Sequence, residues 1–149
     1  MSSVRPRIDA GDVARVAAAV PVLLVLDVMV RLLGVRRSQQ VLERLVPLRA
    51  LPPDRDPAGG VEAAGAALAL DRAAARVCRW SGRCLRRSLA LWAWLRLRGV
   101  DAQIQFGVRR QGTALVGHAW VSHDGLAIAE SAEMLAAHVS FGEVNDPGS

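Results

Sequence analysis

RCLRRSLAL, residues 83–91, places a cysteine at the start of an apolar helix. Further along, GHAWV at residues 117–121 places a histidine inside a predicted strand. The reactive form of cysteine is the thiolate, and a helix N-terminus together with a neighbouring imidazole lowers the pKa of a thiol. A cysteine activated in this way can form a covalent acyl intermediate. The two stretches therefore indicate a cysteine hydrolase with Cys84 and His118 in its site.

The helix that begins at Cys84 is predicted to be the centre of the fold. Its leucines and tryptophans, over residues 89–95, surround nearly the whole helix, and a helix that is apolar all round is buried. After Gly99 the apolar residues alternate, which predicts strands at 102–108, 114–121 and 126–130, then a short helix at 131–138. Helices followed by strands predict an α+β fold, in which the nucleophile helix packs on a small antiparallel sheet.

The first half of the chain is predicted to be helical. Helices are expected at 9–33, ending at Gly34, at 38–46, and at 61–79 with Leu68, Ala75 and Cys78 on its inner side. Between them, residues 47–60 contain four prolines and a Gly-Gly pair, which is typical of a linker. We therefore divide the chain into a helical N-terminal part, 1–50, and a catalytic core, 61–141.

The amino-acid composition limits the kinds of binding partner and the cellular compartment expected for the protein. The net charge of +5 comes from arginine alone, and the arginines are scattered, which argues against a nucleic-acid partner. Two cysteines six residues apart on one helix do not form a disulfide framework, so we expect a reducing, cytoplasmic location. The apolar run 16–26 contains Pro21, precedes Asp27 and falls short of the roughly 20 residues that span a membrane. We expect a buried helix there, with a membrane-surface helix as the alternative and no transmembrane segment.

Five short blocks together resemble a known family: RCL at 83–85, RSLAL at 87–91, LRGV at 97–100, FGV at 106–108 and HAWV at 118–121. They are similar to the transglutaminase-like, papain-related cysteine hydrolases, and within these to the leader peptidase of lasso-peptide biosynthesis. The resemblance covers about residues 61–130. It implies a Cys-His-acid triad with Cys84 as nucleophile and His118 as general base. Glu130 stands at the position of the acid, which in the family is usually aspartate.

The resemblance also implies the reaction and its partners. The family removes the leader from a ribosomally made precursor peptide before an ATP-dependent lasso cyclase closes the ring. We therefore expect the precursor peptide, that cyclase and a separate leader-binding protein as partners, and no metal or cofactor. Trp80 and Arg83 lie beside the nucleophile and are candidates for the oxyanion hole or the substrate groove, although Trp80 could equally be a core residue.

The turn at residues 123–125 decides whether Glu130 can join the triad. Asp124 is too far along the strand from His118, about 20 Å at about 3.3 Å per residue. A three-residue loop with Gly125 left-handed sets Glu130 directly opposite His118. A two-residue Asp-Gly turn shifts the register by one and points Glu130 to the other face. Both turns stay open, and direct pairing of Glu130 with His118 depends on the three-residue loop.

Two other classes of function stay open at this point. One is a different transglutaminase-like amidase or acyl transferase, and the other is a non-catalytic interaction module of the same fold. Cys78 is expected to be structural, since a buried cysteine is usually an inert small apolar residue. His123 and His138 are expected to be solvated.

Overall fold

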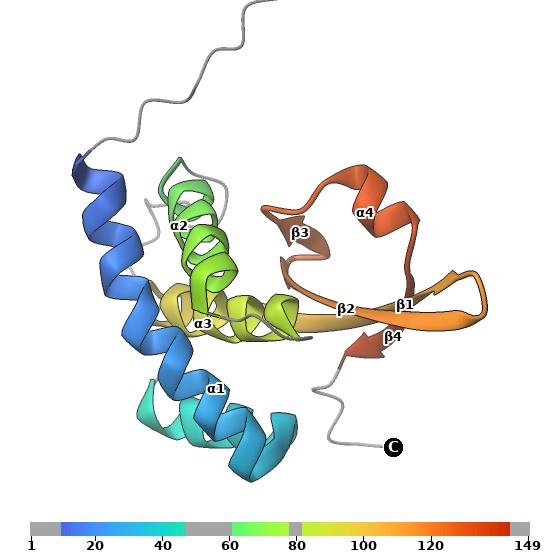
Figure 1. Ribbon diagram of the computed structural model, residues 1–149, viewed down its shortest axis with the longest axis horizontal. Coiled ribbons are helices and arrows are strands. Elements are labelled where there is room, and N and C mark those ends of the chain that lie inside the picture. Colours follow the sequence, from blue (N-terminus) through green and yellow to red (C-terminus); the bar gives the residue numbers. More distant parts are fainter. Residues whose placement is uncertain (1–9, 47–60, 78–81, 144–149) are drawn as a thin grey trace, which may run out of the picture.

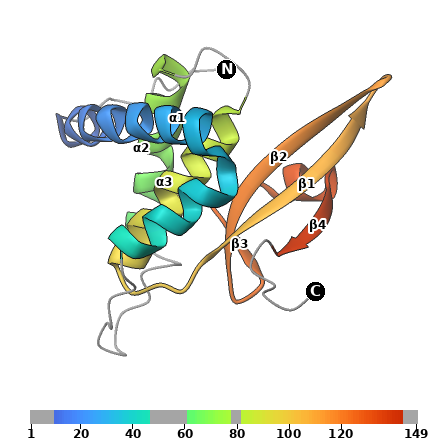
Figure 2. The ribbon, with the colours of Figure 1, turned by 90° about the horizontal axis from the view of Figure 1, so that it is seen from below.

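The computed structural model describes residues 10–46, 61–77 and 82–143. Three helices come first and a four-stranded antiparallel sheet of order β3-β2-β1-β4 follows, which confirms the predicted α+β fold (Figure 1). The elements are α1 Ala10–Leu45, α2 Val61–Val77, α3 Arg83–Leu97, β1 Gln103–Gln111, β2 Ala114–His123, β3 Leu126–Ile128, α4 Ala132–Ala136 and β4 Val139–Glu143. Helices α1, α2 and α3 lie together at one end, and the β1–β2 hairpin projects away from them (Figure 2).

Helix α1 consists of two helices joined at Gly34. This residue has φ of 76° and ψ of 172°, and the left-handed φ suits glycine because it has no Cβ. The predicted end of the first helix at Gly34 is therefore confirmed. The helix continues through Pro21. The predicted linker 47–60 lies outside the described residues.

Helix α1 packs one side into the core, but its exposed side also carries many apolar residues. Leu23 and Leu26 are buried in the core, whereas Val25 and Leu32 are 59% and 77% exposed. By length and composition, the stretch Val13–Leu45 is one helix that could cross a membrane, a property that core helices and signal sequences share. The absence of a transmembrane segment stays a prediction.

The core forms where α3 packs on α1, α2 and the sheet. Helix α3 buries Leu89, Leu91, Trp92 and Leu95, as its all-round apolar pattern predicts. The same core takes in side chains of the other helices and of the sheet: Leu23, Leu26, Leu70, Ala73, Ala74, Ile104, Val121 and Ile128. The first helix thus shares its core with the catalytic part, and the division of the chain at 47–60 stays a prediction.

The inner side of α2 differs from the predicted one. Ala73 and Ala74 are fully buried, whereas Leu68 is 49% exposed and Ala75 is also exposed. The alanine-rich sequence leaves the helical phase poorly defined, because small apolar residues occur on every side of the helix. Cys78 lies outside the described residues.

Two features of the sheet correct the sequence analysis. Strand β3 pairs with β2 through His123↔Leu126 and Val121↔Ile128, so the loop is the two-residue turn Asp124-Gly125, both with positive φ. Of the two turns that stayed open, this is the one expected to point Glu130 away from His118. Residues 139–143 form β4 on the side of β1 away from β2, where the sequence predicted no strand.

Candidate active site

The first turn of α3 is held in place by two contacts of the Arg86 side chain. Its guanidinium donates to the carbonyl of Gly82, with Nη1 at 2.9 Å, and forms an ion pair with Asp27 of α1. Gly82 caps the helix with φ of 93°, and a Cβ there would lie 2.6 Å from Arg86 Nη1. The left-handed backbone favours glycine, and any other residue would also have to displace the Arg86 side chain. The helix end that carries Cys84 is therefore tied to α1.

Cys84 lies on the face of α3 that meets β2. Residues three and four apart on a helix share a face, so Cys84, Arg87 and Ser88 point the same way. The buried Ser88 hydroxyl donates to the carbonyl of Ala119, at 2.9 Å, directly beside His118. Cys84 lies one turn nearer the helix start, about 6 Å along the axis. Its side chain is half-buried and not in a disulfide, and among the described residues it makes no hydrogen bond to His118.

The imidazole of His118 is held between two other rings. Trp120 stacks with it at 6.0 Å between centroids, and the His138 ring is tilted against it at 5.2 Å. Gly107 is the β1 residue opposite His118, and a Cβ there would approach the Trp120 ring to 3.0 Å. The missing side chain thus leaves room for the stack. His138 is held in turn, with Nδ1 2.7 Å from the carbonyl of Met134.

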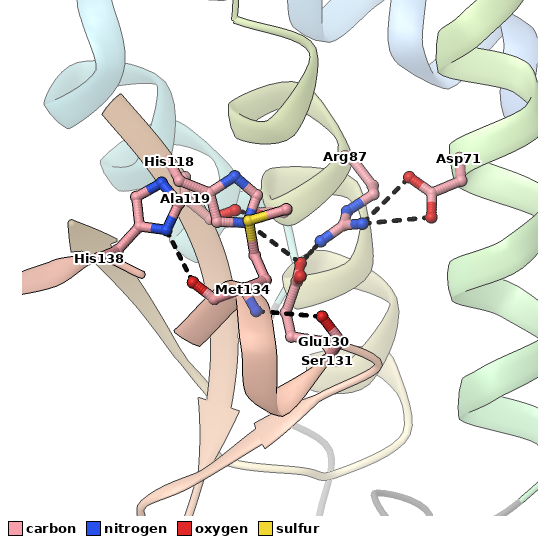
Figure 3. Close-up of polar contacts among 9 residues, drawn as sticks. Asp71, Arg87, His118, Ala119, Glu130, Ser131, Met134 and His138 are labelled. Carbon is pink, nitrogen blue, oxygen red and sulfur yellow. Dashed lines mark hydrogen bonds and ion pairs between the residues drawn. The ribbon is translucent and has the colours of Figure 1, made fainter. Parts of the chain in front are cut away.

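Glu130 reaches His118 in a way that differs from the prediction. In the observed register a continued strand would place Glu130 opposite Ala119, on the wrong face. The strand ends at Ile128, and Ala129 adopts a left-handed φ of 56°, which turns the chain out of the ladder. The Glu130 carboxylate then lies 3.5 Å from His118 Nε2 (Figure 3). The two residues do meet, but at the edge of β2 and not across a strand pair.

Arg87 links this carboxylate to the nucleophile helix. Its Nη2 forms an ion pair with Glu130, while Nη1 lies 3.0 Å and 3.2 Å from the two carboxylate oxygens of Asp71 on α2. The side chains of Arg87 and Glu130 are only 11% and 6% exposed. Asp71, Arg87, Glu130 and His118 therefore form one continuous chain of polar contacts (Figure 3).

This environment lowers the pKa of His118 below its usual 6.5. Burial is the largest cause, because it disfavours the charged imidazolium, and the positive charge of Arg87 is the next. His138 and Arg109 act in the same direction, and Asp71 opposes them. His118 is consequently neutral at pH 7 and can accept a proton.

The contact with Glu130 indicates which nitrogen would be the base. A neutral imidazole carries one proton, and a carboxylate favours the tautomer with that proton on the nitrogen facing it. Nε2 lies 3.5 Å from Glu130 Oε1, although within the described residues neither atom has a hydrogen-bond partner, and a proton on Nε2 would leave Nδ1 as the basic nitrogen. A productive dyad then needs Nδ1 to face the Cys84 sulfur.

The remaining predicted site residues are less well placed. Trp80 lies outside the described residues, and Arg83 is exposed in the first turn of α3. The expectation of a solvated side chain is wrong for His138, which is 9% exposed, whereas the side chain of His123 is 31% exposed, with Nδ1 2.9 Å from the carbonyl of Asp101. Within the described ranges, no group of three or more His, Cys, Asp or Glu side chains could hold a metal ion.

The sequence analysis did not identify Asp71, Arg87, Trp120 and His138 as neighbours of His118. Two of them carried a local signal. Arg87 lies three residues after Cys84 on the same helix face, and Trp120 lies two residues after His118 on the same strand face. Asp71 and His138 are brought in by tertiary packing alone.

Glu130→Gln is expected to lower kcat substantially, by up to about 10⁴-fold, as for the orienting acid of a triad. The amide keeps the shape of the side chain, but it has no charge to stabilise the imidazolium. Asp124→Asn is the control, because Asp124 is 87% exposed in the turn and lies away from His118. Steady-state kinetics of the two variants, with thermal melts to show that both are folded, check this. Equal activity of Glu130→Gln and wild type would remove Glu130 from the site.

Comparison with known families supports the assignment of the core. A family model described as the transglutaminase-like superfamily matches residues 22–141, from the middle of α1 to β4. The match thus takes in the segments that carry Cys84, His118 and Glu130. No curated protein and no solved structure matches the chain significantly.

Proposed function

Because the chain belongs to the transglutaminase-like superfamily, we propose that it is a cysteine peptidase that removes the leader from a lasso-peptide precursor. The observation that carries the proposal is the contact of Glu130 with both His118 and Arg87. It joins the histidine block of β2 to the face of α3 that bears Cys84. The joint presence of the RCL, RSLAL and HAWV blocks supports the lasso-peptide family within the superfamily.

In the proposed reaction, His118 Nδ1 takes the proton from the Cys84 thiol, and the sulfur attacks the carbonyl at the end of the leader. A C–S bond forms and the C–N bond breaks, while the imidazolium returns its proton to the leaving amine of the core peptide. Water then attacks the thioester, which releases the leader as a carboxylic acid and restores the thiol. Glu130 stabilises the imidazolium in both steps. The oxyanion would be held by backbone N–H groups near the start of α3.

We propose two protein partners in the cytoplasm. A separate leader-binding protein would present the precursor, and the ATP-dependent cyclase would close the ring on the released core peptide. The family resemblance supports both partners, and the net charge of +5 would favour binding to acidic surfaces.

We expect the protein alone to cleave its precursor slowly, and the leader-binding protein to raise kcat/KM. The physical reason is that a bound leader raises the effective concentration of the scissile bond at the site. Mass spectrometry of precursor incubated with the protein, with and without the leader-binding protein, measures this. Full activity of the protein alone at micromolar substrate contradicts the split of functions.

The same experiment separates the other classes of function. An amidase or acyl transferase of the superfamily would leave the precursor intact yet form a thioester at Cys84 with a small amide substrate. A non-catalytic module would bind the precursor or its partner and produce neither leader nor thioester. Either outcome overturns the peptidase proposal.

A further inference from the structure

Arg87 is the residue that joins three separate elements of the site. It leaves α3 on the Cys84 face, contacts both carboxylate oxygens of Asp71 on α2, and contacts Glu130 after β3 (Figure 3). Asp71 is 51% exposed, whereas Arg87 and Glu130 are almost buried. The guanidinium therefore connects a solvated carboxylate to a desolvated one.

We propose that Arg87 is a positioning residue, which holds the Glu130 carboxylate at the edge of β2 so that it faces His118. The kinetic part of this inference rests on the proposed peptidase function. Glu130 needs such a partner, because β3 ends two residues before it and strand pairing no longer fixes its direction. A buried carboxylate with no cation beside it would be costly, and it would turn to solvent or take up a proton.

Arginine suits this role better than lysine. Its planar guanidinium can bind two groups in fixed directions at once, whereas an ammonium is a single point of charge on a flexible chain. Here one nitrogen serves Asp71 and another serves Glu130. Arg86, the preceding residue, points to α1 instead and pairs with Asp27.

Arg87 also changes the charge that His118 experiences. The charged and titratable groups around the imidazole are Arg87 on α3, Asp71 on α2, Arg109 on β1, His138 before β4, and Glu130. Glu130 alone would favour the imidazolium. Since Arg87 already balances that carboxylate, the resting imidazole stays neutral and free to accept the thiol proton.

A titration of His118 by NMR tests the charge relationship without any need for activity. Arg87→Met should raise the pKa of His118, by on the order of one unit, because a positive charge is lost and Glu130 becomes free to pair with the imidazolium. Asp71→Asn should lower it, because the negative charge of Asp71, which favours the imidazolium, is lost. General loosening of the site would move both pKa values upward, toward that of a solvated histidine. Shifts in the same direction, or no shift in Arg87→Met, overturn the proposal.

Kinetics of the full-length variants test the positioning. Arg87→Met should lower kcat by about 100-fold, as a misplaced catalytic group does, with a smaller change in KM. Arg87→Lys should keep the lowered pKa of His118 and recover part of kcat. Arg109→Met is the matched control: it also removes a positive charge near His118 but has no contact with Glu130, so kcat at the pH optimum should stay at the wild-type value. Loss of kcat in Arg109→Met equal to that in Arg87→Met contradicts positioning.

Two further outcomes separate a test of the role of Arg87 from a folding defect and from a failure of the proposed function. If Arg87→Met does not fold by circular dichroism, Arg87→Lys carries the kinetic comparison, and the lowered pKa of His118 expected in Asp71→Asn carries the titration. If the wild-type protein cleaves no precursor, the proposed function fails, while the opposite shifts of the His118 pKa in Arg87→Met and Asp71→Asn still decide the role of Arg87.

Discussion

Cys84→Ala is expected to abolish leader removal, with a loss in kcat on the order of 10⁴-fold or more. The reason is that no other described side chain on the α3 face beside His118 could form the acyl intermediate: Ser88 is buried and donates to the carbonyl of Ala119. Fold stability should change little, because a small residue replaces a small, half-buried one. Precursor cleavage followed by mass spectrometry, together with a thermal melt, measures both effects.

Cys78→Ala is the matched control for this experiment. It removes the other cysteine of the chain, six residues earlier, and should retain cleavage. If Cys78→Ala were inactive and Cys84→Ala active, the nucleophile would be wrongly assigned. If both variants were fully active, the reaction would not use a cysteine of this chain.

His118→Ala should lower kcat by about 10²–10⁴-fold, the usual contribution of a general base. The pH profile of the wild type should show the same group. Since the pKa of His118 lies below 6.5, the rate should hold from neutral pH to below 6.5 and fall as His118 takes up a proton. The stability should also fall as the pH drops from about 6.5 to the lower folded-state pKa of His118, because in that range the unfolded state binds the proton more readily than the folded state.

His123→Ala is the control for the histidine experiment. His123 is on the same strand and half-buried, but its ring contacts the carbonyl of Asp101, away from Glu130. It should retain cleavage and the acid limb of the profile. If the fall in rate at acid pH persisted in His118→Ala, or disappeared in His123→Ala, the general base would be a group other than His118.

The architecture could be predicted from the sequence because each element has a strong local signal. The tryptophans and leucines of α3 predict a buried helix, Gly34 and Gly99 end helices, and the alternation over β1 and β2 predicts strands. Strand β4 could not be predicted in this way. Its short sequence, Val139–Glu143, is a strand because it pairs with β1, and that depends on tertiary contact.

The position of Glu130 shows a different limit. The Asp124-Gly125 pair forms a two-residue turn, which was the alternative expected to point Glu130 away from His118. The left-handed backbone at Ala129 restores the contact, and no residue preference predicts it, because alanine rarely adopts positive φ. Glu130 and His118 were thus expected to meet, and they do so by a route that only the structure reveals.

If His118 activates Cys84 as a nucleophile, the Cys84 thiol should be alkylated rapidly by iodoacetamide at pH 7. Peptide mapping by mass spectrometry gives the rate at each cysteine, so Cys78 is an internal reference in the same molecule. The account predicts that Cys84 reacts at least about tenfold faster than Cys78, since the thiolate is the reactive form. It also predicts that His118→Ala removes this difference while His123→Ala preserves it. A Cys84 rate that is unchanged in His118→Ala would contradict the account.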